Sequence, residues 1–370
     1  MQIVVAPDSL KGTAAAHDVA GALAAGWLNE RPEDDVVLMP MADGGEGTIA
    51  AFLAAVADAE FEDVSVTGPH GEPVDAGWVD LGDGTAVVEL GLCCGIELLG
   101  ADRRPMTATT DGFGQAIAAA LDSGVTRLVL GIGSSASTDG GAGVLRALGA
   151  RILDADGVAL SATADDLARA MTVDLTGLRP LPPGGVTVLT DVTNPLLGQT
   201  GSAAVFAPQK GADPGQIERL ERTLTHWSEL LNAAVPAADA AAAGAGAAGG
   251  TGFALQAWGA VIRPGAAAIA DLIGLADVLA DADLVVTGEG SYDASSTAGK
   301  VPVEVARFAA ERGVPVALVA GRIAPDADTS AFAAAISLTE VAGSAQAAMT
   351  LPEMFLADAG AQLARTLARH

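Results

Sequence analysis

The sequence predicts an α/β protein with two domains, and three observations carry this prediction. Strand-like apolar runs alternate with helical segments at both ends of the chain, short alternating strands fill part of its middle, and 50% of the 370 residues are hydrophobic. Alternating strands and helices are typical of parallel βαβ units, whereas closely spaced alternating strands are typical of antiparallel hairpins. A chain of this length and composition can build two cores.

The amino-terminal segment reads as strand, helix, strand, helix. We expect strands at 3–6 and 36–39 and helices at 14–29 and 48–57. The pattern then changes to strands at 62–67, 74–80 and 85–90, separated by turn signals such as His70-Gly71 and Gly82-Asp83-Gly84. These turns predict antiparallel hairpins.

Helices and strands alternate again in the rest of the chain. We expect helices at 112–123, 141–150, 214–234 and 301–312, and strands at 127–131, 186–189, 284–287 and 314–320. The tail, 341–368, is mostly helical with a break near Pro352. The simplest architecture joins 1–66 and 281–370 into a Rossmann-like parallel-sheet domain and makes 67–280 an inserted α/β domain with a mixed sheet. A cleft between the two domains would then hold the chemistry.

Composition excludes several classes of protein. A net charge of −27 would repel nucleic acid, so we expect no nucleic-acid partner. The longest uncharged run, 240–262, holds six glycines, which favours a loop leading into a buried helix over a membrane span. No secretory leader is expected, and the adjacent Cys93 and Cys94 are poorly placed for a disulfide. We therefore expect a cytoplasmic protein.

The chain has only three lysines, and each has a glycine as a neighbour. They are Lys11, Lys210 and Lys300, against 16 arginines. Glycine allows close backbone approach to a ligand and lysine adds a mobile positive charge, so the pairing suits phosphate or carboxylate. The alternative is that each lysine simply sits in a surface turn.

Five loops rich in glycine and polar residues follow predicted strands, at 7–12, 42–48, 131–141, 190–195 and 287–293. In open α/β sheets, ligands bind beyond the carboxyl ends of the strands. The loop 131–141 is the strongest candidate, because glycines and hydroxyls before a helix make an anion cradle. The alternative is that Asp43 and Asp139 only cap helices.

These loops carry seven carboxylates, some of which we expect to be caps or turn residues. They are Asp8, Asp43, Glu46, Asp139, Asp191, Glu289 and Asp293. Phosphoryl transfer uses carboxylates to hold Mg²⁺ and to accept the proton of the attacking hydroxyl. For this base we choose Asp191, at the end of an apolar strand, with Asp8 as the runner-up.

Standard motifs point away from other chemistries. At Gly299-Lys300 the Walker A pattern fails, because Ala294 replaces its first glycine and Val301 its Ser or Thr. The glycines at 244, 246 and 249 follow no predicted strand, so a dinucleotide fingerprint is not expected. No nucleophile elbow is present.

Seven motifs in order along the chain give it a family resemblance. These motifs are the segments 4–12, 41–48, 131–143, 191–196, 206–212, 247–250 and 287–302. Together they resemble the type-1 glycerate kinases. The resemblance implies ATP, Mg²⁺, two α/β domains with the site between them, and transfer of the γ-phosphoryl group to the 2- or 3-hydroxyl of glycerate.

Individual residues in and around these motifs are expected to have separate roles. Catalysis is expected from Asp191, Lys11 and Asp8, and metal binding from Glu289 and Asp293. Substrate or nucleotide binding is expected from Ser9, Asp43, Glu46, Gly133, Ser134, Ser135, Thr138, Asp139, Asn194, Lys210 and Lys300. We expect these residues to converge on one cleft.

The chain departs from the family at several positions. The family usually has Gly at Ser134, Asn at Thr138 and Ser at Cys94, and often Arg at Ser291 and Gln at Ser295. Lost Arg and Gln side chains would alter nucleotide contacts. Two other functions stay open: a kinase for another small hydroxy acid, and a non-catalytic sensor of glycerate or nucleotide. A homodimer is also considered.

Overall fold

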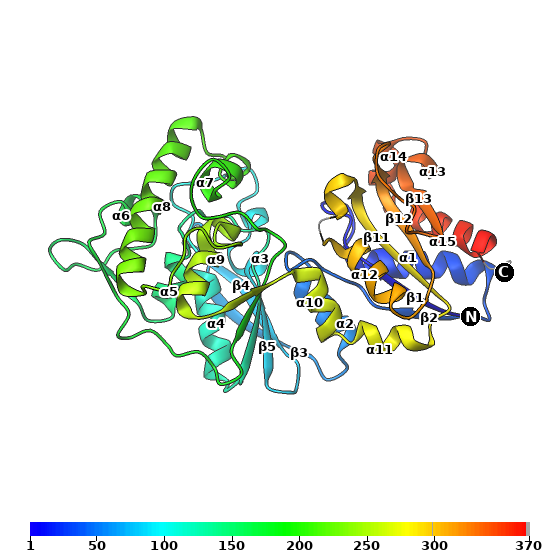
Figure 1. Cartoon of the computed structure of the whole chain (residues 1–370), viewed down its shortest axis with the longest axis horizontal. Coiled ribbons are helices and arrows are strands. Elements are labelled where there is room, and N and C mark those ends of the chain that lie inside the picture. Colours follow the sequence, from blue (N-terminus) through cyan, green and yellow to red (C-terminus); the bar gives the residue numbers. More distant parts are fainter. Residues whose placement is uncertain (298, 368–370) are drawn as a thin grey trace. The chain divides into compact units, whose positions relative to one another are not determined.

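The computed structural model describes residues 1–297 and 299–367. It confirms the α/β class, with one parallel sheet and one mixed sheet (Figure 1). The chain forms two compact units: the first holds Met1–Asp43, Ala50–Ala57 and the chain from Pro264 onward, and the second holds Gly44–Ile49 and Asp58–Arg263.

These boundaries differ from those predicted, 1–66 with 281–370 around 67–280. The reason at the first boundary is that β3 (Glu60–Thr67) pairs along its whole length with β4 (Pro73–Asp80) and so belongs to the second unit. At the other boundary, α10 (Gly265–Leu272) and α11 (Leu275–Val278) belong to the first unit. Two independently folding domains stay a prediction.

The first unit is built on a five-stranded sheet in the order β13-β12-β11-β1-β2. All neighbouring strands are parallel: β1 (Gln2–Pro7), β2 (Asp35–Leu38), β11 (Leu284–Tyr292), β12 (Val316–Ile323) and β13 (Ala334–Ser337). Strand β1 lies between β11 and β2, and its residues Ile3, Val4 and Val5 are at most 1% exposed. Such burial is expected of a parallel strand that is covered by helices on both faces.

Helices cover the two faces of this sheet. On one face α1 (Ala16–Glu30) packs against α15 (Pro352–Leu367), side by side in Figure 1. The other face carries α12 (Val301–Ala310), which packs on β11. The chain also includes α2 (Thr48–Ala55), α13 (Leu338–Val341) and α14 (Ala345–Thr350). The predicted break near Pro352 is the start of α15, where proline fits the first helical position.

The order of the strands defines where a ligand can bind. From β1 the chain moves to β2 on one side, and from β11 it moves through α12 to β12 on the other side. The carboxyl ends of β1 and β11 therefore flank a topological switch point. Loops diverge at such a point and leave a crevice for a ligand.

The second unit contains a six-stranded sheet in the order β10-β9-β6-β5-β4-β3. The expected hairpins are present, because β3, β4 and β5 are antiparallel neighbours. The other pairs are parallel, through β5 (Thr85–Glu89), β6 (Arg127–Gly131), β9 (Val186–Leu189) and β10 (Val261–Arg263). The small sheet of β7 (Arg151–Leu153) and β8 (Thr172–Asp174) was not predicted, because each strand has only three residues.

Helices surround this second sheet. They are α3 (Leu90–Cys94), α4 (Asp111–Asp122), α5 (Ala142–Ala147), α6 (Ala164–Leu167), α7 (Ser202–Phe206), α8 (Pro214–Ala234) and α9 (Ala247–Trp258). As predicted, the uncharged run leads into a buried helix, α9. In the described part of the chain no helix combines the length and apolarity that a bilayer crossing requires.

Candidate active site

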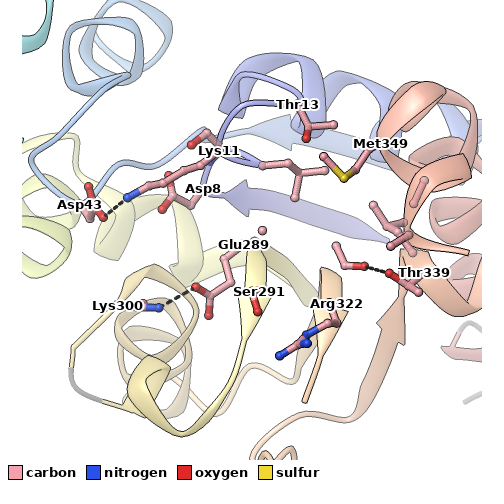
Figure 2. A pocket seen from close by; sticks show the side chains of 17 residues that line it. Asp8, Lys11, Thr13, Asp43, Glu289, Ser291, Lys300, Arg322, Thr339 and Met349 are labelled. Atoms are coloured by element: carbon pink, nitrogen blue, oxygen red, sulfur yellow. Dashed lines mark hydrogen bonds and ion pairs between the residues drawn. The ribbon is translucent and has the colours of Figure 1, made fainter. Parts of the chain in front are cut away.

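A cavity of about 420 Å³ lies at the switch point of the first unit. Its polar end is lined by Asp8 and Lys11 after β1, Asp43 after β2, Glu289 on β11 and Lys300 before α12 (Figure 2). Parallel strands end at the same edge of a sheet, so these charged side chains, far apart in sequence, face one space. The sequence predicted all five of these residues as site residues.

Asp8 is the carboxylate most affected by its surroundings. Its backbone N–H donates to the Gly288 carbonyl at 2.8 Å, and its Oδ1 accepts from the Ser9 N–H at 2.6 Å. Burial, with a further contribution from the nearby Asp43 charge, raises the pKa of Asp8 to about 7, although Lys11 opposes the shift. A carboxyl group with a pKa near neutrality is suited to accept and release protons.

Lys11 and Asp43 form an ion pair with 3.0 Å between Nζ and Oδ2. The two residues come from loops that follow neighbouring strands, β1 and β2. Partial burial disfavours the charged amine, but Asp43, Asp8 and Glu289 outweigh it and raise the pKa of Lys11. Lys11 is therefore a permanent cation at the polar end of the cavity.

Glu289 and Lys300 face each other across the same cavity, with 3.4 Å between Oε2 and Nζ. Burial raises the pKa of Glu289, although Ser296 and Lys300 oppose the shift. The other carboxylate oxygen, Oε1, is buried and has no hydrogen-bond partner among the described residues. A buried acceptor without a donor calls for a ligand at this point.

The donor set at this end fits Mg²⁺ bound together with phosphates. Within the described ranges no group of three His, Cys, Asp or Glu residues could hold a metal by itself. Mg²⁺, however, is usually held by one or two carboxylates plus substrate phosphates and waters. The orphaned Glu289 oxygen and the Asp8 and Asp43 carboxylates meet that need. Asp293 does not line the cavity, and its metal role stays a prediction.

Ser291, at which the resemblance led us to expect an arginine, has an arginine beside it in the structure. In the β11–β12 register Ser291 lies opposite Arg322, and both line the cavity. Arg322 is exposed and makes no ion pair with any residue that the structure describes. The side chain of Ser295, the other departure in this region, lies outside the described part.

The third lysine, Lys210, forms hydrogen bonds with the loop 131–141 of the second unit. Lys210 is only 2% exposed and donates hydrogen bonds to Ser135 Oγ, at 2.8 Å, and to the Ser137 carbonyl. Lys210 is therefore not in a surface turn. Burial lowers the pKa of Lys210 to about 7, despite the Asp139 charge.

The same loop contains strained backbone and unpaired hydroxyls. Ser134 has a φ of 60°, which is uncommon outside glycine. The Ser137 and Thr138 hydroxyls are buried and have no hydrogen-bond partner in the described part of the chain. Strained backbone and unsatisfied polar atoms concentrate at functional sites.

Asp139 has a structural role in this region. Its carboxylate accepts from Thr110 N and Oγ1, Gly141 N and Gly143 N at 2.7–3.2 Å. These bonds tie the starts of α4 and α5 together. The ligand contact that the sequence predicts for Asp139 stays a prediction.

The structure also identifies Glu89, which the sequence analysis missed. At the end of β5, Glu89 is buried and accepts from the backbone N–H groups of Gly47, at 3.3 Å, and Ile49, at 3.0 Å. Burial raises the pKa of Glu89 to about 7. Glu89 therefore fixes the loop that carries Gly44 and Glu46. Its only sequence signal is a carboxylate that ends a buried strand.

The proposed base, Asp191, follows β9 by two positions. Gly131 and Leu189 are partners in the β6–β9 register, so the loops 131–141 and 190–195 leave one edge of the sheet. Gly133 donates to the Gly44 carbonyl at 3.1 Å, and the Asn194 carbonyl accepts from Gly246 at 2.9 Å. Glu46 is exposed.

The predicted site residues thus form two groups. Asp8, Ser9, Lys11, Asp43, Glu289 and Lys300 line one cavity of the first unit. The second unit holds Ser134, Ser135, Thr138, Asp191 and Asn194 in loops and Lys210 at the end of a short 3-10 helix. The expectation that both groups share one cleft stays a prediction.

The switch point of the parallel sheet carries a cavity that is lined by two lysines and three carboxylates. Fold and site together define an α/β protein that is suited to bind anionic ligands and has the groups that phosphoryl transfer requires. A family model described as the glycerate kinase family matches residues 3–368. The chain therefore belongs to the glycerate kinase family.

Individual relatives agree with this assignment. The chain is 41% identical over 330 residues to glycerate 2-kinase of Escherichia coli K12, covering 88% of this chain and 86% of that protein. It is 40% identical to a glycerate kinase of Bacillus subtilis 168, covering 89% and 87%. The crystal structure of a protein assigned as glycerate kinase 2 from Salmonella typhimurium LT2 superposes with a TM-score of 0.86 at 39% identity, over 100% of this chain and 98% of that chain.

Proposed function

We propose that this chain is a glycerate kinase that transfers the γ-phosphoryl group of ATP to a hydroxyl of glycerate. The observation that carries the proposal is the cavity where Lys11 and Lys300 face Asp8, Asp43 and Glu289. Phosphoryl transfer needs cations for the charge on the equatorial oxygens and carboxylates for Mg²⁺. Family membership supplies the acceptor, and the name of the E. coli relative favours the 2-hydroxyl.

Within this proposal each residue has a separate task. Lys11 and Lys300 hold phosphate oxygens. Glu289, with Asp8 or Asp43, would hold Mg²⁺, which when bound neutralises charge on the phosphates. Asp191 accepts the proton of the attacking hydroxyl, with Asp8 as the alternative base. The carboxylate of glycerate would be bound by hydroxyl, amide and ammonium groups of the second unit. These groups belong to Ser134, Ser135, Thr138, Asn194 and Lys210.

A coupled assay of ADP release tests the proposal. Glycerate should give turnover with MgATP, whereas lactate, glycolate and tartrate should give little. Turnover with another acid in preference to glycerate would replace the acceptor, and binding without turnover would favour a sensor. The expected homodimer and cytoplasmic location stay predictions.

A further inference from the structure

The cavity at the switch point has a second end that the proposed chemistry does not use. Its wall is apolar and consists of Leu10, Leu338, Ala345, Ala348 and Met349. Figure 2 shows Met349 and Thr339 at the opposite end of the cavity from Asp43 and Lys300. The polar end accounts for phosphates and Mg²⁺, so the apolar end needs another occupant.

The apolar wall combines a buried floor with an exposed rim. Leu10 and Leu338 are at most 4% exposed, whereas Met349 is 60% exposed. The small alanines of α14 leave room above the floor. An exposed methionine beside such a space is suited to a flat aromatic ring, because its thioether contacts rings favourably and adapts its shape.

Glycerate cannot use this wall. It has three carbons, all of which carry oxygen, so no part of it gains from an apolar surface. The cavity volume of about 420 Å³ also falls in the range of about 300–1,000 Å³ that is typical of sites for larger small molecules. A nucleotide has both required ends, an aromatic base and a polyphosphate.

Polar groups lie between the two ends, where a sugar would be. Ser291 and Arg322 are neighbours across β11 and β12, and Figure 2 shows both between Glu289 and Thr339. The Thr339 hydroxyl donates to the Gly321 carbonyl at 2.9 Å and keeps its own oxygen as an acceptor. The Arg322 guanidinium, without an ion pair in the described residues, can contact a phosphate or stack on a ring.

We propose that this cavity is the nucleotide site, with the base of ATP on the Leu10–Leu338–Met349 wall, the sugar beside Arg322, and the polyphosphate between Lys11 and Lys300. The proposal rests on the proposed kinase function and adds the ligand and its orientation. It also assigns glycerate to a place outside this cavity.

The test measures MgADP binding to the full chain by isothermal titration calorimetry, with no acceptor present. Ala345→Trp fills the apolar end from an exposed position, and Gln346→Trp is the matched control on the same helix, outside the cavity. Ala345→Trp should weaken MgADP binding at least tenfold, and Gln346→Trp should leave it within twofold. The KM for glycerate should stay within twofold in both variants.

Met349→Ala provides a second variant that removes atoms instead of adding them. The loss of a thioether–ring contact predicts binding weakened by about twofold to tenfold. Thermal melting of each variant checks folding. If Ala345→Trp does not fold, Met349→Ala decides the question by itself.

Several results would overturn the inference. If MgADP affinity is unchanged in both Ala345→Trp and Met349→Ala, the base of the nucleotide does not bind on this wall. If only the KM for glycerate rises, the cavity is the acceptor site. If the cavity substitutions weaken MgADP binding but the chain does not turn over glycerate, only the proposed acceptor is wrong. If the chain turns over glycerate but the cavity substitutions leave MgADP binding unchanged, only the proposed nucleotide site is wrong. If the chain binds no MgADP, both the nucleotide site and the kinase function are wrong.

Discussion

Lys210 donates a hydrogen bond to Ser135, with 2.8 Å between Nζ and Oγ, although 75 positions separate the two residues. The lysine is buried without an ion pair to any residue of the described chain, and its second bond goes to the Ser137 carbonyl. Charged groups that are buried in proteins are normally paired with an opposite charge. This arrangement supports an acceptor role for the loop 131–141.

The depressed pKa of Lys210 predicts how stability depends on pH. Burial lowers this pKa from 10.5 to about 7, so between these values the unfolded chain binds a proton that the folded chain has released. The contribution of Lys210 to the free energy of unfolding therefore rises with pH above about 7. We expect the difference in melting temperature between wild type and Lys210→Met to change in favour of wild type from pH 7 to 9. A constant difference would mean that Lys210 titrates normally.

Lys11 and Lys300 should both be needed for turnover. Each faces the polar end of the cavity, and removing one cation from a transition state of phosphoryl transfer should lower kcat by about 10²–10³-fold. Steady-state assays of Lys11→Ala and Lys300→Ala measure this loss, with thermal melting as the check on folding. Near-normal turnover of Lys11→Ala would exclude its charge from the mechanism.

Ser134→Gly should stabilise the protein. The φ of 60° at Ser134 is a conformation that glycine adopts without steric strain, and a non-glycine residue there costs of order 1–3 kcal/mol. Part of that gain is lost to the greater freedom of glycine in the unfolded chain, so we expect about 1 kcal/mol. Urea unfolding measures it, and Ser135→Gly, on the next residue, is the comparison. A destabilised Ser134→Gly protein would show that the side chain makes a contact worth more than the strain.

Asp191→Asn tests the general base. The substitution keeps the shape and removes the proton acceptor, so kcat should fall by about 10²–10⁴-fold with little change in the KM for ATP. Asp8→Asn is the parallel variant, because burial raises the pKa of Asp8 to about 7 and makes it a competent base. A loss under about fivefold in Asp191→Asn, with a large loss in Asp8→Asn, would move the role to Asp8.

The polar half of the site could be predicted because its residues follow strands. Asp8, Lys11, Asp43 and Glu289 sit at or just after β1, β2 and β11, and parallel strands bring such positions together. The apolar wall could not be predicted, since Ala345, Ala348 and Met349 resemble any helix surface in sequence.

Other features depend on three-dimensional context that no local pattern encodes. Glu89 ends a strand of ordinary composition, and only its contact with Gly47 and Ile49 reveals a role. The burial of Lys210 follows from the packing of loops far apart in sequence, and the φ of Ser134 is visible only in coordinates. The strands β7, β8 and β10 were not predicted because each has only three residues, and β13 was not predicted although β2 and β9, which are equally short, were.

Phosphorus NMR of a reaction with ATP, Mg²⁺ and glycerate tests directly whether this chain phosphorylates glycerate. We expect the γ-phosphate signal of ATP to disappear while signals of ADP and 2-phosphoglycerate appear in equal amounts, and we expect Lys11→Ala to suppress both changes. Formation of 3-phosphoglycerate would correct the hydroxyl and keep the kinase. Unchanged ATP, or inorganic phosphate as the only new phosphate besides ADP, would contradict the proposal that this chain phosphorylates glycerate.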